Sequence, residues 1–207
     1  MREYKGWWLP DNESHIQQYI AEGLPYQGGT HGIAILASDR YNLAIDIGAH
    51  VGMWSWSLCN AFRQVMAFEP IPLYAECLAK NAPTAEIYHY ALGNESGMIS
   101  MAVPDDNTGA AYVSPEGLPV QCFRLDDFNL APDFIKVDVE GYELWALQGA
   151  EKTLRKHYPA VCVECKRGPA RYGLGQHDAV DYLISLGYDY AVAAHEDWIV
   201  KKRCFTR

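Results

Sequence analysis

The chain has 207 residues, enough for one domain with a sizeable hydrophobic core. Charged residues make up 21% of the sequence and aromatic residues 13%, which argues against a disordered chain. The formal net charge of -9 disfavours tight contact with a phosphate backbone, so we expect no nucleic-acid partner.

The sequence begins without the apolar stretch of a secretion signal, and no apolar run approaches membrane-spanning length. We therefore expect a cytoplasmic protein with no membrane partner. Six cysteines are scattered along the chain, and the pair Cys162 and Cys165 has no second pair to complete a zinc site. All six, including Cys204, are interpreted as reduced packing residues.

Strand and helix signals alternate after a preface of residues 1–40, which is expected to form a lid with one short helix over residues 15–22. A polar loop is expected around Tyr26 to Thr30. Strands are predicted over residues 43–47, 65–69, 87–91, 134–139 and 160–164, and helices over 53–62, 72–81 and 142–157. Residues 92–127 are rich in turn residues and predict hairpin-like strands.

The last part of the chain, residues 165–207, predicts a helix over 178–186 and a hairpin of strands 188–194 and 198–202. Alternating strands and helices imply an α/β fold, a mostly parallel, doubly wound sheet with helices on both faces. The hairpin adds an antiparallel strand at the end. We expect residues 1–207 to form a single domain, with its cofactor-binding and catalytic core in residues 43–164.

The segment Asp46 to Gly52, D-I-G-A-H-V-G, is the most informative motif. A strand that ends in an acid, turns through small residues and opens a helix is typical of a nucleotide-cofactor corner. His50 stands where the dinucleotide fingerprint G-x-G-x-x-G requires glycine. The corner therefore suits a positively charged ligand without phosphates, such as S-adenosylmethionine. The cofactor-binding candidates here are Asp46, Gly48, Ala49, His50 and Gly52, and the glycines allow the backbone to approach the ligand.

A second acid supports this interpretation. Glu69 ends the next predicted strand, 17 residues after Gly52, and Pro70 sets the turn that follows it. An acid at this position can accept hydrogen bonds from both ribose hydroxyls of a cofactor. A helix cap at Asp46 and a solvated strand end at Glu69 would be the structural alternative.

Three charged residues, Lys136, Asp138 and Glu140, alternate along a strand that is otherwise apolar, so they should lie on one side of it. Burying a charged group is costly, so three charged residues on a buried strand require a structural or functional explanation. Mutual pairing of Lys136 with a carboxylate is one explanation and a polar active-site rim is another, and both can hold.

The ordered motifs resemble the FkbM-type S-adenosylmethionine-dependent methyltransferases. They are D-I-G-A-H-V-G from Asp46, A-L-G from Ala91, L-D-D-F from Leu125, K-V-D-V-E-G-Y-E from Lys136, L-Q-G-A from Leu147 and V-C-V-E from Val161. The family commonly has Asn at the position of His50. The resemblance implies a Rossmann-like, seven-stranded class I methyltransferase fold and methyl transfer to a hydroxyl on a small molecule or a sugar.

The resemblance also implies roles for single residues. Glu69 would bind the ribose, Ala91 and Leu92 would flank the adenine, and Asp138 and Glu140 would face the reacting methyl group. A hydroxyl acceptor benefits from a general base, for which the candidates are Asp138, Glu140 and His50.

Two strand-end carboxylates, Asp138 and Glu164, are a weak metal signal, so we expect no metal. A non-catalytic S-adenosylmethionine-binding protein and, less favoured, an NAD-dependent oxidoreductase are the alternative functions. The acceptor, a small molecule or a glycan, and the oligomeric state stay open.

Overall fold

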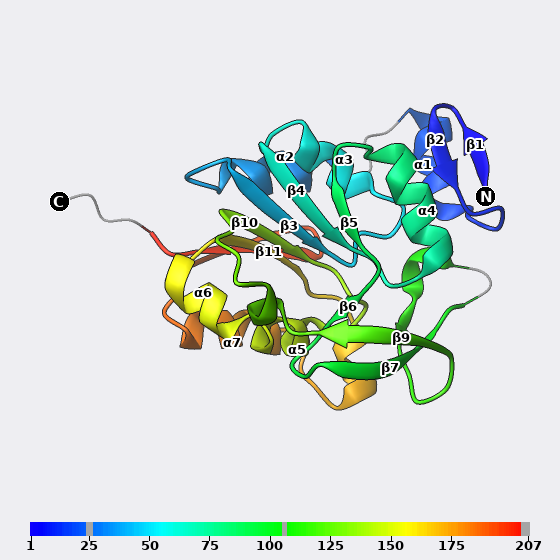
Figure 1. The fold of residues 1–207 in the computed structure, drawn as a ribbon. Coiled ribbons are helices and arrows are strands. Elements are labelled where there is room, and N and C mark those ends of the chain that lie inside the picture. The colour runs from blue at the N-terminus through cyan, green and yellow to red at the C-terminus, as the bar shows by residue number, and fades with distance from the viewer. Residues whose placement is uncertain (24–26, 105–106, 204–207) are drawn as a thin grey trace.

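The computed structural model describes residues 1–23, 27–104 and 107–203, so the expectations for Tyr26 and Cys204 lie outside the described residues. Its centre is a seven-stranded sheet (Figure 1). Along the chain the strands are β3 (Leu43–Ile47), β4 (Gln64–Phe68), β5 (Glu86–Tyr88), β10 (Phe134–Val137), β11 (Ala160–Glu164), β12 (Tyr190–Ala194) and β13 (Asp197–Lys201).

The strands lie side by side in the order β12-β13-β11-β10-β3-β4-β5. The pairs from β11 to β5 are parallel, whereas β13 runs antiparallel to both of its neighbours. The expected mostly parallel sheet with a C-terminal antiparallel hairpin is therefore confirmed. The chain order reverses between β3 and β10, and ligands of open α/β sheets bind at such a switch point.

Helices cover both faces of this sheet (Figure 1). The helices α2 (Gly28–Leu36), α3 (Met53–Cys59) and α4 (Pro72–Asn81) lie on one face, and α5 (Glu143–Gln148), α6 (Glu151–His157) and α7 (Asp178–Ser185) lie on the other. Alternation along β3 explains the two layers, because Ile45 and Ile47 pack with residues of α5–α7 while Ala44 packs with residues of α3.

The N-terminal preface forms a hairpin, β1 (Arg2–Tyr4) and β2 (Trp7–Leu9), followed by α1 (His15–Glu22). Leu9 and Ile16 are buried against Val51 and against Cys77 of α4, so this segment packs on the helical layer beside the glycine loop. Among the described residues, no helix combines the length and apolar character needed to span a membrane.

A second, four-stranded sheet is formed by residues 91–123. It consists of β6 (Ala91–Leu92), β7 (Gly97–Ala102), β8 (Tyr112–Val113) and β9 (Leu118–Phe123) in the order β6-β9-β7-β8. The expected hairpin-like strands are therefore present. Short 3-10 helices, η1 (Thr108–Ala110), η2 (Leu125–Phe128) and η3 (Gly168–Tyr172), connect the larger elements.

Two predicted elements are divided in the structure, one where the chain passes from one sheet to the other and one where a glycine meets neighbouring backbone. The strand predicted over residues 87–91 splits: β5 ends at Tyr88 in the main sheet, and β6 begins at Ala91 in the second sheet. The helix predicted over residues 142–157 is broken between α5 and α6 at Gly149. A Cβ on Gly149 would lie 1.9 Å from the carbonyl oxygen of Gly93, so the break accommodates the chain that enters the second sheet.

Further boundaries differ from the prediction. The strand predicted over residues 134–139 ends at Val137, so Asp138 and Glu140 follow the strand and do not lie along one side of it. The loop expected around residues 26–30 is wrong from Gly28 onward, because α2 begins there. The helix expected over residues 53–62 ends earlier, at Cys59. Ala34 of α2 is buried against the main sheet, whereas Ile33 and Leu36 are exposed.

Candidate active site

A pocket opens at the carboxyl ends of β3, β4 and β10. This position is typical of small-molecule sites. The pocket is lined by Ile47, Gly48, His50, Phe68, Glu69, Pro70, Tyr74, Tyr90, Ala91, Leu92, Ile99, Met101, Thr108, Gly109, Ala111, Val113, Asp138, Val139, Glu140 and Tyr142. The second sheet and η1 thus form one wall, and the main sheet forms the other.

The glycine loop is held against neighbouring backbone. Gly48 has φ +79°, and a Cβ at this position would lie 1.9 Å from the carbonyl oxygen of Asp138. The amides of Gly48 and Ala49 both donate to the carbonyl oxygen of Phe68 at 3.0 and 3.1 Å. Glycine is therefore required at Gly48 for the close approach of β3 and β10 as well as for the left-handed backbone.

Glu69 lines the pocket directly after β4, as predicted from the sequence. Its Oε2 accepts a hydrogen bond from the His50 amide at 2.8 Å, and its Oε1 accepts one from the Ile71 amide at 2.8 Å. The side chain is buried, and burial raises the pKa of Glu69 to about 7. Each oxygen retains a lone pair, so this carboxylate can accept further hydrogen bonds from a diol.

Three of the cofactor-binding candidates do not line the pocket: Asp46, Ala49 and Gly52. Asp46 is buried on β3, and its Oδ2 accepts a hydrogen bond from the Ser55 hydroxyl of α3 at 2.6 Å. Burial raises the pKa of Asp46 to about 6. Asp46 therefore ties the end of β3 to α3 behind the loop, and its contact with a cofactor stays a prediction.

Behind the pocket, Lys136 is completely buried on β10 and pairs with two acids. Its Nζ lies 2.8 Å from Oδ1 of Asp197 and 3.4 Å from Oδ2 of Asp138. Burial opposes the charge, but Asp138 and Asp197 hold the pKa of Lys136 well above its usual value. Lys136 in turn lowers the pKa of Asp138 against the effect of burial. The pairing expected for Lys136 is thus present, and Asp138 also lines the pocket.

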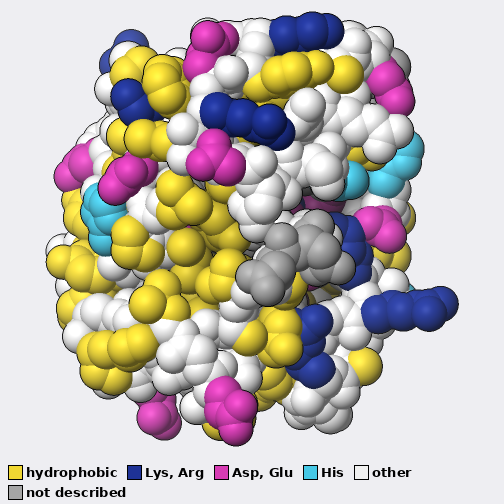
Figure 2. Space-filling view, turned by 90° about the vertical axis from the view of Figure 1, so that its right-hand side faces the viewer, with side chains coloured by type: hydrophobic (Ala, Val, Ile, Leu, Met, Phe, Trp, Pro, Cys, Tyr) yellow, Lys and Arg dark blue, Asp and Glu magenta, His cyan; other side chains and the backbone are white. Residues whose placement is uncertain are grey.

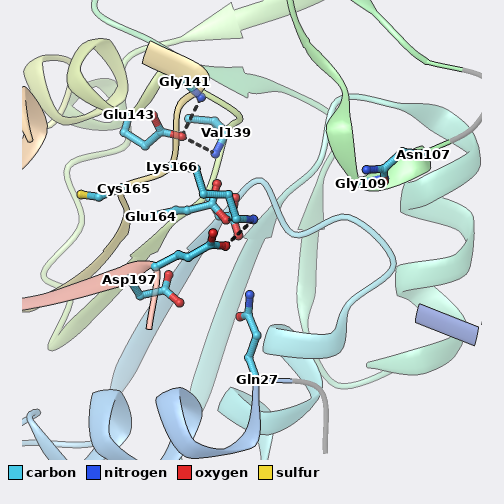
Figure 3. Close-up of polar contacts among 12 residues, drawn as sticks. Gln27, Asn107, Gly109, Val139, Gly141, Glu143, Glu164, Cys165, Lys166 and Asp197 are labelled. Carbon is cyan, nitrogen blue, oxygen red and sulfur yellow. Dashed lines mark hydrogen bonds and ion pairs between the residues drawn. The ribbon is translucent and has the colours of Figure 1, made fainter. Parts of the chain in front are cut away.

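Asp138, Glu140 and Glu164 form an acidic cluster, with carboxylate oxygens within 4.8 Å of one another. Burial raises the pKa of Glu140 to about 7 and that of Glu164 to about 10. Lys166 forms an ion pair with Glu164, and Figure 3 shows these two side chains beside Asp197. The cluster offers oxygen ligands that a divalent cation accepts, yet Lys166 already supplies positive charge there. The absence of a metal stays a prediction.

A loop of residues 165–172 packs against the turn at Glu140 and Gly141. Gly141, at φ +107°, and Gly168 are in such close contact that a Cβ on Gly141 would lie 2.4 Å from the backbone of Gly168. This contact brings Lys166 and Arg171 near Glu140. The Arg171 guanidinium lies 3.8 Å from the ring centroid of Tyr112. Figure 2 shows Lys and Arg side chains at the top and on the right-hand side of the face that it draws.

Three residues in or near the site received no assigned role from the sequence. Gln27 accepts a hydrogen bond from the Trp54 indole at 2.8 Å, and Figure 3 shows its side chain directed toward the acidic cluster. Thr108 and Tyr74 line the pocket wall beside His50. The N-T-G turn from Asn107 was one available signal, because the Asn107 side chain accepts from the Gly109 amide at 3.1 Å and shapes η1.

Comparison with solved structures places the fold in a known class. The chain superimposes with a TM-score of 0.56 on a methyltransferase FkbM from Methylobacillus flagellatus KT, at 20% identity over 78% of this chain and 43% of that one. A TehB-like SAM-dependent methyltransferase from Corynebacterium glutamicum gives a TM-score of 0.51 at 12% identity, over 90% of this chain and 91% of that one. The fold is that of class I S-adenosylmethionine-dependent methyltransferases, as expected.

Sequence comparison identifies the family. The profile of the methyltransferase FkbM domain matches residues 46–190, and the chain belongs to this family. A hexuronic acid methyltransferase, AglP of Haloferax volcanii, is 33% identical over 121 residues, which cover 53% of this chain and 50% of that protein. The match thus spans about half the length of this curated relative.

Proposed function

We propose that the chain is an S-adenosylmethionine-dependent methyltransferase that methylates a hydroxyl group of a sugar acid. The proposal rests on one pocket at the switch point of the sheet. Glu69 and the loop from Asp138 to Glu140 both line this pocket. Family membership supports the reaction class.

The residues of the pocket fit the ribose, the adenine and the sulfonium group of this cofactor. Glu69 would accept hydrogen bonds from the ribose hydroxyls, beside Pro70. Ala91 and Leu92 would flank the adenine, with Tyr90 as an aromatic neighbour in the same wall. Asp138 would lie near the sulfonium, because an acid kept ionised by Lys136 stabilises a cationic donor. Gly48 and His50 line the space between the ribose and this acid.

When bound, S-adenosylmethionine supplies a methyl group on a positively charged sulfur that is a good leaving group. The remaining tasks of the protein are to position the acceptor hydroxyl in line and to remove its proton. Glu140 suits the second task, because burial and the neighbouring Asp138 raise its pKa to about 7, near the working pH of a general base. Asp138, whose pKa is lowered, suits electrostatic positioning.

The acceptor class is inferred from the positive charge close to Glu140. Lys166 and Arg171 lie on the loop of residues 165–172, and both interact electrostatically with Glu140. An acceptor carboxylate would bind these cations while a neighbouring hydroxyl faces Glu140. The 33% identical relative is named as a hexuronic acid methyltransferase, which agrees with this class. The Gln27 amide, directed toward the same cluster, would donate to the acceptor.

The test measures transfer of a labelled methyl group from S-adenosylmethionine to hexuronic acids and to the matching neutral hexoses. We expect transfer to the acids only. Glu140→Gln should slow single turnover by roughly 10²–10⁴-fold with unchanged cofactor affinity, whereas Asp138→Asn should also weaken cofactor binding. Glu116→Gln, at an exposed residue far along the second sheet, is the matched control. Failure of the purified chain to bind S-adenosylmethionine would refute the proposal.

A further inference from the structure

A hydrogen-bonded chain links the N-terminal preface to the pocket. Glu13 is buried, its Oε1 accepts a hydrogen bond from the Ile16 amide at 2.7 Å, and its Oε2 accepts one from the Thr108 hydroxyl. The same hydroxyl oxygen lies 3.1 Å from Nε2 of His50. Glu13 thus reaches His50 through the buried Thr108, which lies 95 positions away from Glu13 in the sequence.

The few available protons determine which group donates and which accepts in each of these hydrogen bonds. A carboxylate has no proton to donate, so the single hydroxyl proton of Thr108 goes to Glu13. The Thr108 oxygen can then only accept from the imidazole, which requires a proton on Nε2 of His50. Burial lowers the pKa of His50 to about 4, so the ring is neutral at pH 7 and its Nδ1 carries a lone pair.

We propose that Glu13 is a positioning residue that acts through Thr108 to fix the Nε2–H tautomer of His50, so that Nδ1 accepts a hydrogen bond from the ligand of the pocket. The ring is also held in place from the other side, where Tyr74 packs edge-on at a centroid distance of 4.6 Å. The inference that this ligand is S-adenosylmethionine rests on the proposed function.

This assignment gives the preface a role in the site. Glu13 lies outside residues 46–190, the part that matches the family, yet it controls a residue of the glycine loop. The His50 amide donates to Glu69 at 2.8 Å, so the backbone of His50 already serves the ribose-binding carboxylate. With the Nε2–H tautomer fixed, Nδ1 of His50 becomes a side-chain acceptor in the same loop. This atom would accept a hydrogen bond from a donor group of the cofactor.

The decisive variant is Glu13→Gln. The amide has one oxygen, and if this oxygen keeps the Ile16 amide, the NH₂ group faces Thr108 and donates to it. The Thr108 hydroxyl would then donate to His50, which reverses the chain and moves the ring proton to Nδ1. Thr108→Val should leave the tautomer unfixed, while Thr108→Ser should retain it. Glu3→Gln, at an exposed preface residue that accepts only from the Gly6 amide among the contacts described, is the control.

The measurement is the pair of ¹⁵N chemical shifts of the His50 ring in the protein without ligand, followed by calorimetry with S-adenosylmethionine. We expect the Nε2–H tautomer in the unmodified chain and in the Glu3→Gln and Thr108→Ser variants. Glu13→Gln should show Nδ1–H and about tenfold weaker binding, the effect of one hydrogen bond. An Nδ1–H or doubly protonated ring in the unmodified chain at pH 7, or an unchanged tautomer in Glu13→Gln, would overturn the assignment.

The two readouts separate the two proposals. A fixed Nε2–H tautomer that responds to Glu13→Gln supports the role of Glu13 even if S-adenosylmethionine does not bind, and only the proposed function is then refuted. Normal cofactor binding with an unresponsive tautomer refutes the role of Glu13 alone. Thermal unfolding of each variant checks that a loss of binding does not come from an unfolded preface.

Discussion

Replacement of Lys136 by methionine should destabilise the protein strongly. Lys136 is fully buried, and its Nζ contacts Asp197 at 2.8 Å and Asp138 at 3.4 Å. Methionine keeps the length and most of the volume but removes the charge. Asp197, itself buried, would then have no ion-pair partner among the described residues. Breaking a buried pair in this way costs about 3–5 kcal/mol, a large part of the 5–15 kcal/mol typical of a domain.

The site should respond to the same change. Without Lys136, the pKa of Asp138 should rise, because its main cationic neighbour is lost. The cofactor's sulfonium would then face a less negative acid, and affinity for S-adenosylmethionine should fall along with stability. The Lys136 ammonium also lies 5.1 Å from the Trp54 ring centroid, so tryptophan fluorescence reports on this region.

The assay is urea unfolding at pH 7 followed by tryptophan fluorescence, with free energies extrapolated to water. Lys152→Met, at an exposed position of α6, should change the free energy of unfolding by less than about 0.5 kcal/mol. The double variant Lys136→Met, Asp197→Asn should be more stable than Lys136→Met alone, because it removes both buried charges. A loss below about 1 kcal/mol in Lys136→Met would refute the buried ion pair as a stabilising unit.

Three further outcomes are expected. Glu69→Ala should weaken S-adenosylmethionine binding by about 1–3 kcal/mol in calorimetry, with exposed Glu76→Ala as the control, and unchanged affinity would remove Glu69 from the site. The raised pKa of Glu69, about 7, means that the folded state binds its proton more tightly than the unfolded state does. Its contribution to the free energy of unfolding should therefore fall as the pH rises from about 4.5 to 7, by at most roughly 1.4 kcal/mol per pH unit, and Glu69→Gln should abolish this slope. Asp126→Ala should cost about 1–2 kcal/mol, because the Asp126 carboxylate caps α6 by accepting from the amides of Lys152 and Thr153 at 2.9 Å; a change under 0.3 kcal/mol would contradict the cap.

Much of the architecture could be predicted because its signals are local. The apolar runs that contain acids near their ends predicted β3 and β11 with the observed bounds. The helix α4 also begins and ends at the residues that its proline and its periodicity indicate. Parallel strands bring their carboxyl ends to one edge, so Glu69 and Asp138 could be expected in one pocket before their contacts were known. The resemblance to FkbM methyltransferases was based on short local motifs at these strand ends, and membership of the family is confirmed.

Other features depend on contacts that a local pattern does not contain. The sequence motif grouped Asp46 with Glu69, whereas the fold turns Asp46 behind the loop toward Ser55. The break between α5 and α6 arises where Gly149 meets Gly93, a neighbour in the second sheet. Helical periodicity continues through Gly149, so the packing against Gly93 decides the end of the helix.

The sequence by itself determined the class of fold, the glycine loop after β3 and the acids at the strand ends, because each rests on residues a few positions apart. The tertiary structure decided which of these groups meet and in what state. Lys136 holds Asp138 ionised, and Glu13 reaches His50 through Thr108, only because distant segments pack together and exclude water. Burial then sets the protonation of each group, and burial is a property of the folded chain.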